Sequence, residues 1–113
     1  MTYPERHQPL INALRQRAAM TLPPESRMYL YGSRARKDSR PDSDWDIHIL
    51  VNGDEHLPFA EECRIAMLIE AVGEDFDEVI NARVHTYLGW EKRFFLPFYK
   101  NVERDSILIF ENY

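Results

Sequence analysis

Two short segments, GSRAR at residues 32–36 and SDWDI at residues 43–47, carry the strongest structural signal in this chain. The first follows a β-prone run at residues 28–31, and its glycine stops that run, so we expect a turn from a strand into a helix. The second opens a run of alternating apolar and polar side chains over residues 44–51. Such alternation predicts a strand with one core face and one polar face.

The first segment has the composition of a phosphate-binding turn. Gly32 lets the backbone approach a ligand closely, and N–H groups at a helix N-terminus bind phosphate. Ser33 suits an N-cap and adds a hydroxyl donor, while Arg34 and Arg36 add positive charge. Because Gly-Ser turns are common, this segment predicts a phosphate site only in combination with the second one.

The second segment carries a pair of acids. Asp44 and Asp46 are two residues apart on the expected strand, so their carboxylates lie side by side on one face. Like charges this close repel unless a proton or a cation lies between them, and Mg²⁺ binds such oxygens while keeping positions open for phosphates. A solvent-exposed strand face would show the same pattern. Aspartate is a poor strand residue, however, which favours a metal site.

The rest of the chain predicts a single α/β (α+β) domain over residues 1–113, with a small mixed sheet and helices packed on one face. The helical spacing of apolar residues and runs of β-prone residues predict the elements. Helices are expected at residues 5–20, 58–72, 87–95 and from 97 to about 104, and strands at 28–31, 44–51 and 77–85. Residues 107–110 suit either a strand or a helix.

Charge is segregated along the chain. Residues 1–41 hold eight Lys/Arg against three Asp/Glu, whereas residues 42–82 hold one against twelve, and the whole chain has a net charge of −5. A basic stretch beside an acidic one suits phosphates and the metal that accompanies them. The acidic balance argues against non-specific nucleic-acid binding, and we expect no sequence-specific DNA binding.

Several function classes are excluded by what the sequence lacks. It has no apolar run long enough for a membrane span and no apolar signal-peptide core in its first ten residues. Its single cysteine, Cys63, cannot form an intrachain disulfide. No P-loop or dinucleotide-binding glycine motif is present. We therefore expect a cytoplasmic protein that does not bind membranes.

In combination, residues 32–47 resemble the signature of the DNA polymerase β-like nucleotidyltransferase superfamily, in particular its minimal nucleotidyltransferase (MNT) branch. The resemblance implies a mixed sheet with helices on one face and the active site on the other. It implies that Gly32 and Ser33 bind the triphosphate, with Arg34 and Arg36 nearby, and that Asp44 and Asp46 bind two Mg²⁺ ions.

The resemblance also implies a third carboxylate on the neighbouring strand. Asp77 and Glu78 are adjacent, so only one of them can face the site. Alternation favours Asp77, whose face also carries Asn81 and Arg83, whereas the family pattern of an acid before two apolar residues favours Glu78. Both residues remain candidates for a catalytic role, and the family pattern makes Glu78 the candidate metal ligand.

The implied reaction is transfer of a nucleoside monophosphate, AMP from ATP, to a hydroxyl of a macromolecular acceptor. A chain of 113 residues has little surface beyond its core with which to hold an acceptor, so the acceptor is expected to be a macromolecule that provides its own binding surface. By family analogy the partner is a HEPN-type toxin in a toxin–antitoxin module. The alternative is a catalytically inactive binding protein of the same fold, which acts by protein–protein contact.

Residues 90–99 hold five aromatic side chains. Trp90, Phe94 and Phe98 recur at helical spacing and are expected in the core, which leaves Phe95 and Tyr99 as exposed candidates for an interface. Among the histidines, His85 is interpreted as structural, whereas His48 suits either a structural or a substrate-contacting role.

Overall fold

A mixed four-stranded sheet forms the centre of the computed structural model, which describes residues 7–113. The strand order is β3-β2-β1-β4, with bounds Arg27–Tyr31 (β1), Trp45–Val51 (β2), Ile80–Thr86 (β3) and Ile107–Glu111 (β4). β1 pairs antiparallel with both β2 and β4, whereas β2 and β3 run parallel. The predicted mixed sheet is thus confirmed, and residues 107–111 form a strand.

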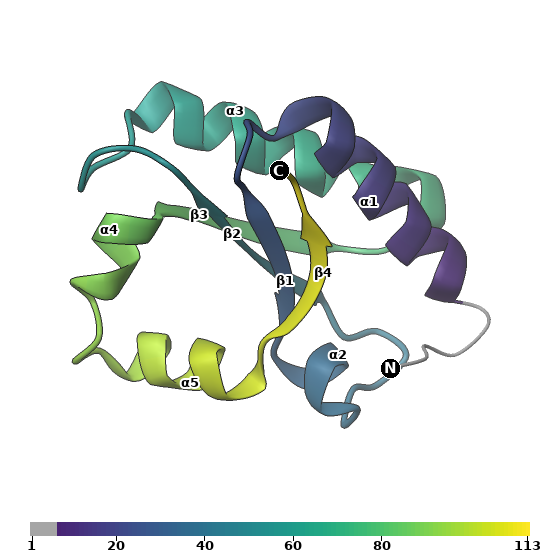
Figure 1. Ribbon diagram of the computed structural model, residues 1–113. Coiled ribbons are helices and arrows are strands. Elements are labelled where there is room, and N and C mark those ends of the chain that lie inside the picture. The colour runs from purple at the N-terminus through teal and green to yellow at the C-terminus, as the bar shows by residue number, and fades with distance from the viewer. Residues whose placement is uncertain (1–6) are drawn as a thin grey trace.

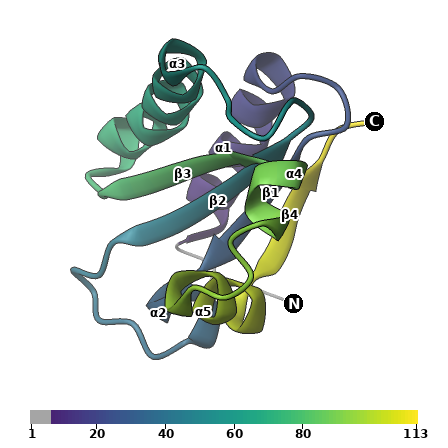
Figure 2. The same cartoon turned by 90° about the vertical axis from the view of Figure 1, so that its left-hand side faces the viewer.

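Two long helices, α1 (Gln8–Thr21) and α3 (Phe59–Glu70), cover one face of the sheet (Figure 1; Figure 2). Their apolar stripes pack on the apolar faces of the central strands, as the alternation over residues 44–51 predicted. The main core comprises, among others, Leu10, Ile11, Leu14, Met28, Leu30, Trp45, Ile47, Ile49, Ile65 and Ile69. Residues 5 and 6 of the expected first helix lie outside the described residues.

Two short helices, α4 (Tyr87–Glu91) and α5 (Pro97–Asp105), lie on the opposite side of the sheet from α1 and α3 (Figure 1). They cover a smaller apolar cluster built on Leu50, Trp90 and Val102, with four tyrosines packed around it. Helices were expected on one face of the sheet, and α1 and α3 form that layer. The short helices α4 and α5 form a second, smaller layer on the other face.

The aromatic segment is only partly buried. Trp90 is buried in the second cluster, but α4 ends at Glu91, so the helical spacing that would have buried Phe94 is interrupted. Phe94 is 64% exposed and Phe95 63%. The expectation that Phe94 and Phe98 belong to the core is therefore wrong, since Phe98 is exposed as well. Tyr99, expected to be exposed, is half-buried against the second cluster.

The third strand begins later than expected. A 3₁₀ helix, η2 (Ala71–Phe76), follows α3 and passes through Gly73, where the sequence predicted the helix to end. Asp77 then adopts a left-handed conformation with φ 55°, and β3 starts only at Ile80. The two candidate third carboxylates therefore precede the strand instead of lying on it.

Among residues 7–113, no helix is long and apolar enough to cross a membrane.

Candidate functional site

The glycine turn (residues 32–36) and the acid pair (Asp44 and Asp46) meet at one point of the sheet. β1 ends at Tyr31, which lies opposite Asp46 in the antiparallel register, and Gly32 follows at once. Gly32 has φ 77° and caps α2 (Ser33–Arg36), so glycine, not the expected Ser33, takes the N-cap position. A Cβ at Gly32 would collide with Oδ2 of Asp46. The residue type at position 32 is thus fixed both by its backbone angle and by the neighbouring carboxylate.

Asp44 and Asp46 lie at the start of β2. Asp44 is exposed and Asp46 is half-buried. Burial raises the pKa of Asp46, and the nearby charge of Asp44 adds to the rise, while hydrogen bonding with Asn81 and the charges of Arg36 and Arg83 oppose it. The pair is therefore held together against its own repulsion, which is the electrostatic situation that a cation relieves.

Asn81 is the third polar side chain at this point. It lies beside Asp46 in the parallel register of β2 and β3, and its Nδ2 donates a hydrogen bond of 2.9 Å to Oδ2 of Asp44. The sequence did not identify Asn81 as a site residue, although alternation placed it on the face of Asp77. Asn81 comes beside Asp46 through the pairing register of β2 and β3, and a local sequence pattern does not show the register of two strands that are distant along the chain.

Arg34 does not face the acid pair. Its side chain is buried, donates to the carbonyls of Ser43 (2.9 Å) and Pro41 (3.3 Å), and lies over the ring of Trp45 at 4.5 Å. It also lies 3.8 Å from the Glu78 carboxylate. Arg34 therefore fastens the loop that connects the glycine turn to β2, and its expected role beside the phosphates is not matched by this placement.

Glu78 and Asp77 are not gathered with the acid pair. Glu78 accepts a hydrogen bond of 3.3 Å from Nε1 of Trp45, a side chain of the main core, in addition to its contact with Arg34. Asp77 is exposed at the end of η2. Within residues 7–113, no group of three or more His, Cys, Asp or Glu side chains is placed to hold a metal ion. The expectation that Glu78 completes a three-carboxylate metal site is not matched, because Arg34 and Trp45 hold its side chain elsewhere.

Arg36 remains close enough to influence Asp46 electrostatically. Its guanidinium makes ion pairs of 2.8 Å with Asp105 on α5 and 3.1 Å with Asp38. The expected phosphate-supporting residue is thus also a link between α2 and α5.

The buried His48 and the half-buried His85 form a pair beneath α4. His48 is 1% exposed, its Nε2 lies 3.0 Å from Nδ1 of His85, and its ring packs against Trp90. Burial lowers the pKa of His48 to about 3, with a contribution from His85. Burial and the charges of Arg93 and Arg83 lower the pKa of His85 to about 4. Both rings are neutral at pH 7, and their packing assigns them a structural role.

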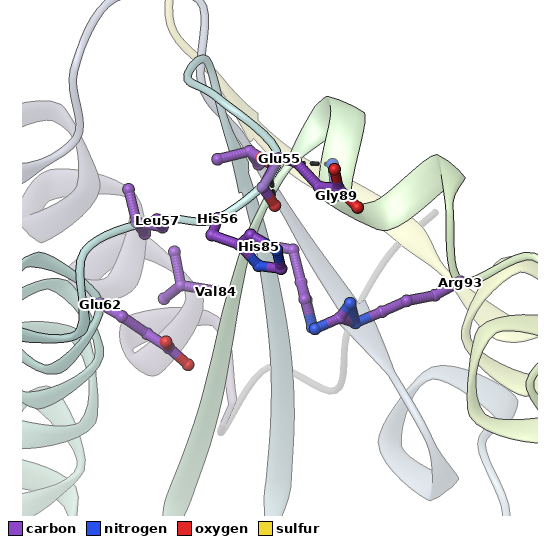
Figure 3. A pocket seen from close by; sticks show the side chains of 9 residues that line it. Glu55, His56, Leu57, Glu62, Val84, His85, Gly89 and Arg93 are labelled. Atoms are coloured by element: carbon purple, nitrogen blue, oxygen red, sulfur yellow. Dashed lines mark hydrogen bonds between the residues drawn. The ribbon is translucent and has the colours of Figure 1, made fainter.

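A separate pocket of about 100 Å³ lies at the other end of β3, beside His85 and Arg93, with Glu62 on its opposite wall (Figure 3). Ligand pockets for small molecules usually enclose at least about 300 Å³. This pocket is therefore too small for a nucleotide, and it includes none of the residues of the acid pair or the glycine turn.

Comparison with solved structures supports the fold. One similar structure is a toxin–antitoxin complex crystallised with AMP-PNP, with a TM-score of 0.61, 15% identity, and coverage of 88% of this chain and 71% of that one. An inferred nucleotidyltransferase from Sulfolobus solfataricus has a TM-score of 0.61 and 19% identity over 92% of this chain and 82% of that one.

A third similar structure is a mutant of the toxin–antitoxin complex MntA–HpeT in which two aspartates, two positions apart, are replaced by glutamate. Its TM-score is 0.58, with 13% identity over 88% of this chain and 70% of that one. No curated protein sequence matches the chain significantly.

The family itself is identified by sequence. A model of the family described as "Polymerase beta, Nucleotidyltransferase" matches residues 25–112, which include the glycine turn, the acid pair and all four strands. The match extends over most of the chain and coincides with the mixed sheet. The chain therefore belongs to the polymerase beta nucleotidyltransferase family.

Proposed function

We propose that this chain binds a nucleoside triphosphate with Mg²⁺ at the acid pair and the glycine turn, and transfers AMP from ATP to a hydroxyl of a macromolecular acceptor. The observation that carries the proposal is the contact between Gly32 and Asp46, since a carboxylate fills the space that any Cβ at position 32 would need. A phosphate on the turn and a cation on the carboxylates would thus be immediate neighbours.

The donor set fits one divalent cation. Asp44 and Asp46 provide hard carboxylate oxygens, and burial, together with the charge of Asp44, raises the pKa of Asp46, so a bound cation would favour its ionised form. A bound Mg²⁺ would supply charge that offsets that of the phosphates. Gly32 leaves room for the ligand, Ser33 supplies a hydroxyl donor, and Arg36 adds positive charge at the edge of the site.

The proposed reaction is a displacement at phosphorus. The acceptor hydroxyl oxygen forms a bond to the α-phosphorus of ATP, and the bond from that phosphorus to the α,β-bridging oxygen breaks. Pyrophosphate leaves, and the hydroxyl proton passes to a base or to solvent. The side chains of this chain orient the phosphates for that displacement.

The proposed acceptor is a protein partner, a HEPN-type toxin, in the cytoplasm. Two similar structures are toxin–antitoxin complexes, and one of them contains an ATP analogue. The exposed Phe94 and Phe95 are available on the described surface as part of a contact area for such a partner.

A second candidate function is binding and neutralisation of the partner without transfer. The placement of Glu78 and Asp77 away from the acid pair favours it, because Asn81 is then the third polar group at the site.

The test is titration calorimetry of ATP with and without Mg²⁺, on the wild type and on the Asp44→Ala/Asp46→Ala double variant. We expect Mg²⁺-dependent binding that the double variant weakens at least tenfold, which is about 1.4 kcal/mol. Asp77→Asn is the matched control, because it removes an exposed acid outside the pair. Wild-type protein that binds ATP no better with Mg²⁺ than without it would refute the proposal.

Transfer is then measured with ATP labelled at the α-phosphate and a HEPN-type partner. Label on the partner supports transfer. Neutralisation of the partner without label, retained in the double variant, supports the second candidate.

A further inference from the structure

Asn81 occupies the position that a third metal-binding carboxylate would need. Parallel register places it directly beside Asp46, and its Nδ2 is 2.9 Å from Oδ2 of Asp44. The third member of the cluster is therefore a neutral amide that lies in contact with the acid pair.

The amide changes what the cluster can bind. As a donor it occupies an Asp44 oxygen without adding negative charge, and as an acceptor its Oδ1 is an uncharged ligand. Two carboxylates give a divalent cation beside the phosphates two anionic ligands. A second cation close by would be repelled by the first and would need a further anionic ligand, and within residues 7–113 no third carboxylate is grouped with Asp44 and Asp46 to supply it.

No neighbouring acid can take the place of Asn81 without disrupting the fold. Glu78 is the acid that lies within 4.0 Å of Arg34 among the described residues, and the Arg34 side chain is only 4% exposed. Turning Glu78 toward the acid pair would leave that buried guanidinium without its carboxylate, which is costly. Asp77 is held at the end of η2, three residues before β3 begins.

We infer that Asn81 limits the site to one divalent cation for each bound nucleotide, where the family resemblance implies two. The inference rests on the proposed function, because it concerns the same site. Transfer by the chain alone is then slow, and Asn81→Asp supplies the missing carboxylate.

The test counts cations and does not depend on activity. Mn²⁺ replaces Mg²⁺, free Mn²⁺ is measured by electron paramagnetic resonance, and the nucleotide is α,β-methylene-ATP, which cannot be cleaved at the reacting bond. We expect one Mn²⁺ for each nucleotide-bound wild-type chain and two for Asn81→Asp. The control Asp77→Asn removes an exposed acid outside the pair and is expected to retain one.

Each outcome is decisive. Two Mn²⁺ ions on the wild type would overturn this inference and leave the proposed function standing. A single Mn²⁺ on Asn81→Asp would show that residue 81 is not what limits the site, which also overturns it. A wild type that binds neither Mn²⁺ nor the nucleotide would refute the proposed function and this inference together. If Asn81→Asp fails to fold, the wild-type count still decides.

Discussion

At Gly32, one residue has to satisfy two requirements. Its φ of 77° lies where side chains are strained, and its missing Cβ leaves room for the Asp46 carboxylate. We expect Gly32→Ala to reduce the free energy of unfolding by about 1–3 kcal/mol and to abolish Mg²⁺-dependent ATP binding, because the methyl group displaces Asp46. Urea denaturation and calorimetry measure the two effects.

Gly53→Ala is the matched control for that substitution. Gly53 also has a positive φ, 151°, and its Cβ would lie 3.1 Å from Cγ2 of Thr86, at the opposite end of β2. We expect a similar loss of stability with nucleotide binding retained. Equal loss of binding in both variants would mean that strain alone, and not the contact with Asp46, explains the effect.

The raised pKa of Asp46 implies that function is maintained at the expense of stability. Because its pKa is higher in the folded than in the unfolded protein, ionisation destabilises the fold, and this penalty is fully present above the folded pKa. Asp46→Asn is expected to raise the free energy of unfolding at pH 7 by less than about 1 kcal/mol, given partial exposure, while Mg²⁺-dependent ATP binding is lost.

The stability gain of Asp46→Asn should vanish when the pH falls below the unfolded pKa of aspartate, near 4. Denaturation at pH 7 and pH 3 measures this difference. A variant that is less stable than the wild type at pH 7 without metal would contradict the electrostatic interpretation of the acid pair.

At the scale of elements, α2 is held by the side chains of Arg34 and Arg36. A helix of four residues, Ser33–Arg36, is too short to be stable alone. Arg34 joins it to the loop carbonyls of Pro41 and Ser43 and to Glu78. The loop that leads to Asp44 is therefore anchored by a buried guanidinium.

Arg34→Met is expected to lower the free energy of unfolding by about 2–3 kcal/mol, because the two carbonyls lose their donor and Glu78 loses its ion-pair partner. Arg40→Met, an exposed arginine in the same loop, should change it by less than about 0.5 kcal/mol. Thermal or urea unfolding compares the two. Equal effects would mean that Arg34 contributes general charge and not a specific anchor.

On the scale of the whole molecule, the pair formed by His48 and His85 makes the free energy of unfolding depend on pH. His48 and His85 have folded pKa values of about 3 and about 4, below the ordinary value of 6.5. The unfolded chain therefore binds more protons below pH 6.5, and stability is expected to fall from there until the folded pKa values are reached, by on the order of 2 kcal/mol for each histidine at pH 5. Denaturation between pH 7.5 and pH 4 measures the slope.

His56→Gln is the control for the pH dependence, because His56 is exposed. It should keep the wild-type slope, whereas His48→Gln should reduce the slope and His48→Gln/His85→Gln should flatten it. A steep slope that survives in the double variant would assign the acid sensitivity to other groups.

Local patterns predicted those parts of the fold that depend on neighbours in sequence. The alternation from Trp45 to Val51 predicts the core face of β2 correctly, and the strand before Gly32 predicts the turn. The expected polar face of β2 is wrong, because α4 and α5 cover it and bury His48 and Leu50. The third site residue was not found, because only the pairing of β2 with β3 brings Asn81 beside Asp46. Likewise, the direction of Glu78 depends on Arg34, which is far away along the chain.

Asn81 also has a consequence for evolution. Asparagine and aspartate codons differ by a single base at the first codon position, so the amide at residue 81 and a carboxylate there are one mutation apart. Under the one-cation inference, this single mutation would add the third carboxylate without altering the sheet, the glycine turn or the acid pair. Related chains are therefore expected to carry either residue at this position.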